Sequence, residues 1–205
     1  MRQRGFTLLE LMIVVAIAAI MVTIGLPSFR QMFDNARTKG SAESVLSGMR
    51  LARAEAIKRN APMRFQLVST LTAACTYLGS STLWVVSQTD QASYGQVAGK
   101  CDQAPALPND PCDASCDGNP YVAYKSEANT GTDVTVTVAA DAPVITFGPL
   151  GQILANLEGT ASLSQVTFTS NNASAKTWRV QVAAPGGSLK LCDTAVAAGQ
   201  PYACS

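Results

Sequence analysis

The sequence predicts an α+β fold in which a long N-terminal helix packs on an antiparallel β-sheet head. Three observations lead to this prediction. Residues 6–26 are almost entirely apolar, and an amphipathic helical pattern follows them to about residue 60. Beyond Pro62, short runs of Val, Thr, Phe and Trp alternate with polar residues at the period of β-strands. Clusters of Gly, Pro and Asn separate these runs, which is typical of strands joined by turns.

The apolar segment from Phe6 to Leu26 holds a single ionisable side chain, that of Glu10. At 1.5 Å per residue it would form a helix of about 30 Å, which matches the hydrocarbon thickness of a bilayer. A basic leader at residues 1–5 precedes it, and the positive-inside rule keeps such a leader cytoplasmic. A secretory signal peptide is the rival interpretation, but the run lacks a small-x-small cleavage site and contains a carboxylate. We therefore expect residues 6–26 to be a transmembrane helix half that crosses the membrane once, with the rest of the chain outside the cytoplasm.

The stretch Gly5-Phe6-Thr7-Leu8-Leu9-Glu10 resembles the processing site of type IV pilins and type II secretion pseudopilins. In that family a prepilin peptidase cuts after the glycine, here Gly5, and methylates the new N-terminal amine, here that of Phe6. The resemblance rests on the short basic leader, the Gly-Phe-Thr motif, the glutamate five residues past the cut and the long apolar run. It implies three partners: other pilin subunits, the prepilin peptidase and the inner membrane. It further implies that residues 6–26 cross the inner membrane once, with the head in the periplasm. The same residues would then form the filament-core helix half when the subunit passes from the membrane into a pilus or pseudopilus at the cell surface.

A lone carboxylate in lipid calls for a partner, and Glu10 has no cation of its own chain within a helical turn except the new amine at Phe6. The resemblance implies that Glu10 pairs with this amine on a neighbouring subunit and so sets the axial register of a filament. The alternative is a neutral glutamic acid with a local hydrogen bond. Further along, Gly25 and Pro27 predict a kink or local melting of the helix.

Residues 27–60 are expected to form the amphipathic half of the same helix, ending at Asn60-Ala61-Pro62. The segment from Ser44 to Asn60, with its Ala-Arg-x-Glu-Ala-Ile core, is similar to the GspH/FimT family of minor pilins and pseudopilins. Apolar residues that recur at spacings of three and four form the expected core-facing stripe: Ala42, Val45, Leu46, Met49, Ala52, Ala56 and Ile57. Charged residues mark the wetter faces: Arg37, Lys39, Glu43, Arg50, Arg53, Glu55, Lys58 and Arg59.

Residues 61–205 are expected to form the β-rich globular head. The strands that we expect are Met63–Ser69, Leu83–Gln88, Tyr121–Lys125, Val134–Ala139, Val144–Phe147, Gln165–Thr169, Thr177–Ala183 and Ser188–Cys192.

An insertion at about residues 90–120 interrupts the strand rhythm with clustered Pro, Asp and Cys. A loop of this length is usually functional or cross-linked, and we interpret it as a surface insertion held by disulfides. Asp113, Asp117 and Asn119 fit no standard calcium loop.

Six cysteines in loop-like sequence suggest disulfides in an oxidising compartment. We expect Cys192 and Cys204 to pair and to tie the final loop to the last strand, which contributes about 3 kcal/mol through loop closure. Three connectivities remain open for the other four cysteines, Cys75, Cys101, Cys112 and Cys116.

The composition argues against an enzyme. The 205-residue chain has no histidine, and therefore neither a Ser-His nor a Cys-His dyad can form. Phosphate-binding and zinc-protease motifs are absent from the sequence. We expect no catalytic residues, no metal and no cofactor. The net charge of +1 does not indicate a polyanionic partner.

DNA binding is the second functional hypothesis. Some FimT-type minor pilins bind DNA during natural transformation, and the resemblance places that activity in a Gly-Arg-x-Arg pattern before the C-terminal Cys-Asp. The matching stretch here begins Gly187-Ser188-Leu189-Lys190 and keeps one positive charge. Lys176, Arg179 and Lys190 are few cations for phosphate contacts, and we do not favour DNA as a partner. We predict a minor pilin-like structural subunit of a type IV pilus, with a role in pilus assembly, adhesion or motility. A type II secretion pseudopilin is the first alternative and a DNA-binding minor pilin the second.

Overall fold

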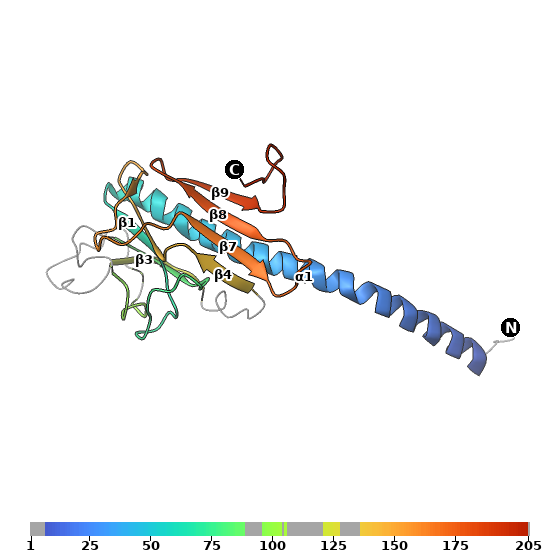
Figure 1. Cartoon of the computed structure of the whole chain (residues 1–205). Coiled ribbons are helices and arrows are strands. Elements are labelled where there is room, and N and C mark those ends of the chain that lie inside the picture. Colours follow the sequence, from blue (N-terminus) through green and yellow to red (C-terminus); the bar gives the residue numbers. More distant parts are fainter. Residues whose placement is uncertain (1–6, 89–95, 104, 106–120, 128–135, 205) are drawn as a thin grey trace, which may run out of the picture.

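A computed structural model describes residues 7–88, 96–103, 105, 121–127 and 136–204, with the side chains of residues 22–28 and 121 excepted. Its dominant element is α1 (Leu8–Arg59), one continuous helix whose first half stands clear of the head (Figure 1). Thr7 caps its start, because the Thr7 hydroxyl accepts a hydrogen bond from the Glu10 backbone N–H at 3.2 Å. Asn60 ends it in the left-handed conformation, with its backbone N–H directed to the carbonyls of Ala56 and Ile57.

The helical assignment runs unbroken through Gly25 and Pro27, so the backbone shows no melted turn there. A bend at Pro27 stays a prediction.

The head contains two antiparallel sheets rather than the single sheet expected from the sequence (Figure 1). The first sheet has the order β3-β2-β1-β5-β6 and the second the order β4-β7-β8-β9. The strands are β1 (Met63–Leu67), β2 (Trp84–Gln88), β3 (Tyr121–Lys125), β4 (Val136–Ala140), β5 (Val144–Phe147), β6 (Ile153–Leu154), β7 (Gln165–Ser170), β8 (Trp178–Ala183) and β9 (Ser188–Asp193). They follow the predicted strands closely, apart from the short β6, which the sequence analysis did not include.

The second half of α1 packs against the inner faces of both sheets and forms the main core with them. Val45, Met49 and Ala52 of the helix are fully buried, as are Phe65 of β1 and Val180 of β8. The alternation of β8, whose Trp178, Val180 and Val182 are buried, places the intervening side chains on the outer face of the second sheet.

A smaller cluster lies on the far side of the first sheet. It contains Val68, Val85 and Val97 together with the disulfide between Cys75 and Cys101, whose Cα atoms are 6.0 Å apart. Because the helix covers one face of β1 and this cluster covers the other, all five residues of β1 are buried.

The disulfide between Cys75 and Cys101 joins the start of the long insertion to the loop between β1 and β2. Cys112, Cys116 and the acidic residues considered for calcium lie outside the described residues.

Gly48 lies in close contact with aromatic side chains of the first sheet. A Cβ atom at this position would lie 2.6 Å from the Trp84 ring and 2.8 Å from the Phe65 ring. The Trp84 indole N–H donates to the hydroxyl of Ser44, one helical turn earlier, at 3.3 Å. The missing side chain of Gly48 therefore allows two large aromatic rings to lie flush against the helix.

We predict that Gly48→Ala destabilises the protein by about 1–3 kcal/mol, because the added methyl overpacks the contact with Trp84 and Phe65. Gly40→Ala is the matched control, since a Cβ atom there meets nothing within 4 Å. It should stabilise the same helix by about 1 kcal/mol through helix propensity. Urea unfolding of the full chain in detergent measures both changes, and equal effects of the two substitutions would contradict the packing argument.

Candidate functional site

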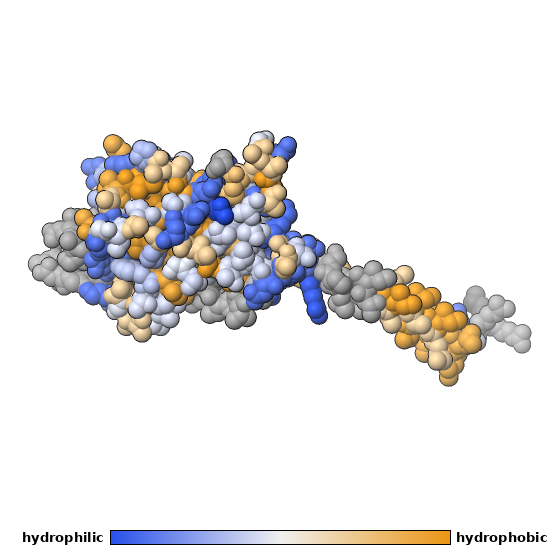
Figure 2. Space-filling view, viewed as in Figure 1, coloured by the Kyte–Doolittle hydropathy of each residue, from blue (hydrophilic) through white to orange (hydrophobic). Residues whose placement is uncertain are grey.

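The first half of α1 presents a continuous apolar surface to its surroundings. The large apolar side chains from Leu8 to Met21 are 50–77% exposed, and Figure 2 shows this half of the helix in orange. Leu8, Leu11, Val15 and Ala19, with Met12 and Ala16 beside them, line a shallow groove along one helical face. Exposed apolar area of this extent marks an interaction surface.

The apolar character continues into the second half, where Phe29, Met32 and Phe33 are 62–69% exposed. Among the described residues, no helical segment is both long and apolar enough to span a bilayer.

Glu10 lies exposed in the first turn of α1, at the end of this apolar surface. The positive end of the helix dipole favours a carboxylate at this place. Gly5 and Phe6 lie outside the described residues, so the expected cleavage site and its amine are not placed.

The head is tied to α1 at the base of the apolar half. The amide of Asn172 donates to the Asp34 carboxylate at 3.0 Å, and the backbone N–H of Lys176 donates to the Asn35 side chain at 2.7 Å. Gln31 donates to the carbonyl of Ser174 at 2.6 Å. The turn between β7 and β8 is therefore hydrogen-bonded to one helical turn of α1.

A second tie lies near the far end of α1, at Arg53. Its guanidinium donates to the carbonyl of Gly151 at 3.0 Å and to that of Gly186 at 3.2 Å. Gly151 precedes β6, whereas Gly186 lies between β8 and β9, so one side chain joins loops of both sheets. Arg53 was expected on a wet face of the helix, and its contacts are with the head instead.

Two other helix positions also differ from the sequence analysis. Glu55, expected on a wet face, is only 5% exposed, whereas Ile57, expected in the core, is 53% exposed. The Glu55 carboxylate accepts hydrogen bonds from Arg59 at 2.6 Å and from Lys58 and Tyr124 at 3.2 Å. Burial raises the pKa of the Glu55 carboxyl, but these hydrogen bonds and the charge of Arg59 outweigh it and hold the pKa below its ordinary value of 4.5.

An ion pair between a buried arginine and a partly exposed glutamate holds the far side of the first sheet. Arg64 of β1 is 1% exposed, and its guanidinium binds both carboxylate oxygens of Glu158, at 2.5 and 2.8 Å. Burial raises the pKa of Glu158, yet hydrogen bonds, chiefly from Arg64, lower it by more, so the pKa lies below its ordinary value of 4.5. The partners are 94 residues apart, and no local pattern in the sequence links them.

The three basic side chains considered as DNA contacts, those of Lys176, Arg179 and Lys190, lie in two separate places. Arg179 and Lys190 project from the outer face of the second sheet, where Arg179 lies opposite Cys192 and Lys190 opposite Gln181. The Arg179 Nε–H donates to the Thr167 hydroxyl at 3.2 Å.

Lys176 lies at the end of this sheet that is nearest the apolar half of the helix. Its ammonium is 3.2 Å from the buried carboxylate of Asp193 and 5.9 Å from the centre of the Trp178 ring. The structure thus brings Arg179 and Lys190 onto one face and engages Lys176 elsewhere. A disulfide between Cys192 and Cys204, with Cα atoms 5.0 Å apart, ties the C-terminal loop to β9.

Two family models match the sequence. The model described as type II transport protein GspH matches residues 41–186, and the prokaryotic N-terminal methylation motif matches residues 1–26. A comparison with curated proteins finds no match.

Two crystal structures of the type IV minor pilin FimU from Pseudomonas aeruginosa strain PAO1 are similar to this chain. Each has 16% sequence identity to it, and the match covers 75% of this chain. The match covers 90% and 86% of the FimU chains, with TM-scores of 0.40 and 0.41.

We predict that Glu158→Gln destabilises the protein by about 3 kcal/mol at neutral pH, because Arg64 is left buried without its counter-charge. A carboxyl with a lowered folded-state pKa stabilises the protein above its unfolded pKa and loses that effect as pH falls through the folded value. The difference in the free energy of unfolding between wild type and variant should therefore be largest above pH 4.5 and should decrease below it.

Urea unfolding of both proteins across this pH range measures the difference. Glu43→Gln is the control, because its carboxylate is exposed and its pairing with Lys39 is worth at most a few tenths of a kcal/mol. A pH-independent difference at Glu158 would show that the ion pair is not the cause.

Proposed function

The chain belongs to the GspH family and carries the prokaryotic N-terminal methylation motif, and from this premise we propose that it is a minor pilin-like structural subunit of a type IV pilus. In this proposal a prepilin peptidase cuts the chain after Gly5 and methylates Phe6. The subunit then assembles through the apolar half of α1. No enzymatic step of its own is needed.

The observation that carries the proposal is the contrast between the two halves of one helix. From about Ala42 onward, α1 packs one face into the head, where Val45, Met49 and Ala52 are inaccessible. The first half leaves its large apolar side chains at least half exposed. Such a surface is stable only when lipid or other apolar helices cover it, and a pilin subunit meets both in turn.

The membrane stage precedes assembly in this proposal. Residues 6–26 cross the inner membrane, with the basic leader in the cytoplasm and the head in the periplasm. The disulfides Cys75–Cys101 and Cys192–Cys204 support an oxidising compartment for the head.

The role proposed for Glu10 is to pair with the methylated amine of Phe6 on a neighbouring subunit. A carboxylate among apolar helices is costly unless a cation meets it, so the pairing selects one axial register. The exposure of Glu10 in the first turn of α1 supports this role, since a neighbouring helix can reach the carboxylate there.

A pseudopilin of a type II secretion system is the alternative, because the matching family is described as a type II transport protein. The same helix and processing site serve either machine. Deletion of the gene separates them, because loss of surface pili supports the pilus and loss of protein secretion with intact pili supports the pseudopilus.

We predict that the mature chain begins at an N-methylated Phe6 when the protein is produced together with a prepilin peptidase. Mass spectrometry of the N-terminal peptide checks this. Gly5→Val should retain the leader, because a branched side chain replaces the glycine at the cut, whereas the control Gly40→Ala should be processed normally. A mature chain that begins elsewhere would contradict the proposed processing.

We further predict that Glu10→Gln lowers the amount of this subunit in sheared filaments at least about tenfold, which corresponds to about 1.4 kcal/mol of lost pairing. The substitution keeps the side-chain size and removes the charge. Glu43→Gln removes an exposed charge from the second half of α1. It should leave the amount of the subunit in filaments unchanged. Immunoblots of sheared filaments against whole cells give the ratio, and equal incorporation of Glu10→Gln and wild type would remove the register role.

A further inference from the structure

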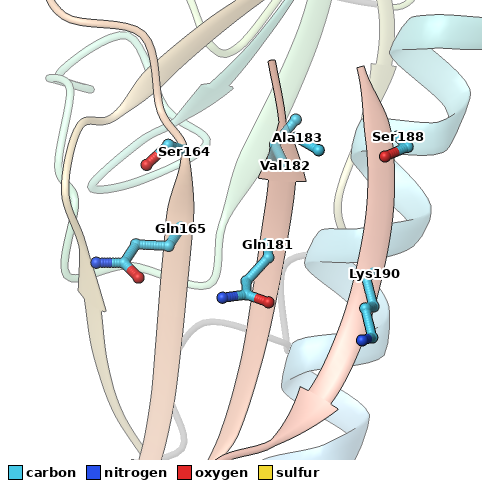
Figure 3. Close-up of a pocket in the computed structure, with 7 residues that line it drawn as sticks. All are labelled: Ser164, Gln165, Gln181, Val182, Ala183, Ser188 and Lys190. Carbon is cyan, nitrogen blue, oxygen red and sulfur yellow. The ribbon is translucent and has the colours of Figure 1, made fainter. Parts of the chain in front are cut away.

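A hollow of about 340 Å³ lies on the outer face of the second sheet, across β7, β8 and β9 (Figure 3). This face is turned away from α1, because the buried side chains of β8 point to the opposite side. The hollow is lined by Ser164, Gln165, Gln181, Val182, Ala183, Ser188 and Lys190. Its volume is at the lower end of the range for small-molecule sites.

Three of these residues form a row across the sheet. Gln165 lies directly opposite Gln181 in the β7–β8 pairing, and Gln181 lies directly opposite Lys190 in the β8–β9 pairing. Residues directly opposite each other project from the same face, and Figure 3 shows the three side chains extending side by side. The register of two strand pairings therefore places two amides and one ammonium next to each other.

The residues that line the hollow offer both hydrogen-bond donors and hydrogen-bond acceptors. The Ser164 hydroxyl donates to the carboxylate of Asp141, which leaves the Ser164 oxygen as an acceptor. Asp141 also accepts from the backbone N–H groups of Ala142, Ser164 and Gln165 at 2.9–3.1 Å. Each glutamine amide contributes both donors and an acceptor, and the ammonium of Lys190 only donates.

This mixture fits a ligand whose groups both donate and accept. Sugar hydroxyls do both, whereas phosphate oxygens only accept and call for clustered cations. Ala183, whose side chain alternates with that of the buried Val182, adds apolar area against which ring C–H groups can pack. The positive charge of Lys190 favours a ligand that also carries an anionic group.

We propose that this hollow binds an acidic sugar, with ring hydroxyls on Gln165 and Gln181 and a carboxylate beside Lys190. The site is on the head, whereas the apolar assembly surface is on the first half of α1. Binding of the sugar and assembly of the subunit are therefore separable functions.

The test uses the full chain in detergent micelles, titrated with an oligomer of galacturonic acid and followed by isothermal calorimetry. A neutral galactose oligomer of equal length is the ligand control, and it should bind at least about tenfold more weakly because it lacks the carboxylate. Lys190→Met and Gln181→Leu should each weaken binding of the acidic oligomer about tenfold or more. Both positions are on the surface of the sheet, and unchanged urea unfolding confirms that each variant folds.

Lys176→Met is the matched protein control. It removes the same charge from the turn before β8, where Lys176 pairs with Asp193 outside the hollow. Binding should remain within about twofold of wild type in this variant.

Three results would overturn the proposal. One is the absence of binding to the galacturonic acid oligomer. Another is an equal loss of affinity for the acidic oligomer in Lys176→Met and Lys190→Met, which would show that only the net charge of the protein attracts it. The last is tighter binding of a DNA duplex than of the acidic sugar, with loss in Lys190→Met, which would assign the face to nucleic acid.

Discussion

The close packing of α1 against both sheets is the contact on which the rest of the structure depends. Gly48 brings the helix against Trp84 and Phe65, and the buried half of α1 supplies the core for a head made of two separate sheets. Arg53 ties both sheets to the helix near one end of this contact, and Asp34 ties the β7–β8 turn at the other. These ties fix the head to the second half of α1 at both ends of the contact.

The buried charges of Glu55 and Arg64 each have partners. Glu55 satisfies its carboxylate with Arg59, Lys58 and Tyr124, which belong to α1 and β3, so the pairing also holds a strand to the helix. On the opposite side of the first sheet, Arg64 of β1 pairs with Glu158 of the segment between β6 and β7. Such pairs add little net stability compared with an apolar contact, but breaking one leaves a charge buried. They act as constraints on which segments can pack together.

The two faces of the molecule that reach its surroundings differ in chemistry. The first half of α1 is apolar and suits lipid or other helices, while the outer face of the second sheet is polar (Figure 2). The polar row from Gln165 to Lys190 is made by strand register, whereas the apolar surface is made by one helix alone. Substitutions on one surface leave the other in place, so their functions can be studied independently.

The sequence by itself determined the features that depend on neighbours along the chain. These are the processing motif, the long helix, its end at Asn60 and the approximate strands, since helical and strand periods and capping are local. Only the tertiary structure decided the division of the strands into two sheets, the pairing of Cys75 with Cys101 and the partners of Arg64 and Arg53. The tertiary structure also decided the burial of Glu55 and the exposure of Ile57. A small rotation of the helix about its axis changes which of its faces the sheets cover. Contacts between residues tens of positions apart depend on how the elements pack, and no period in the sequence encodes them.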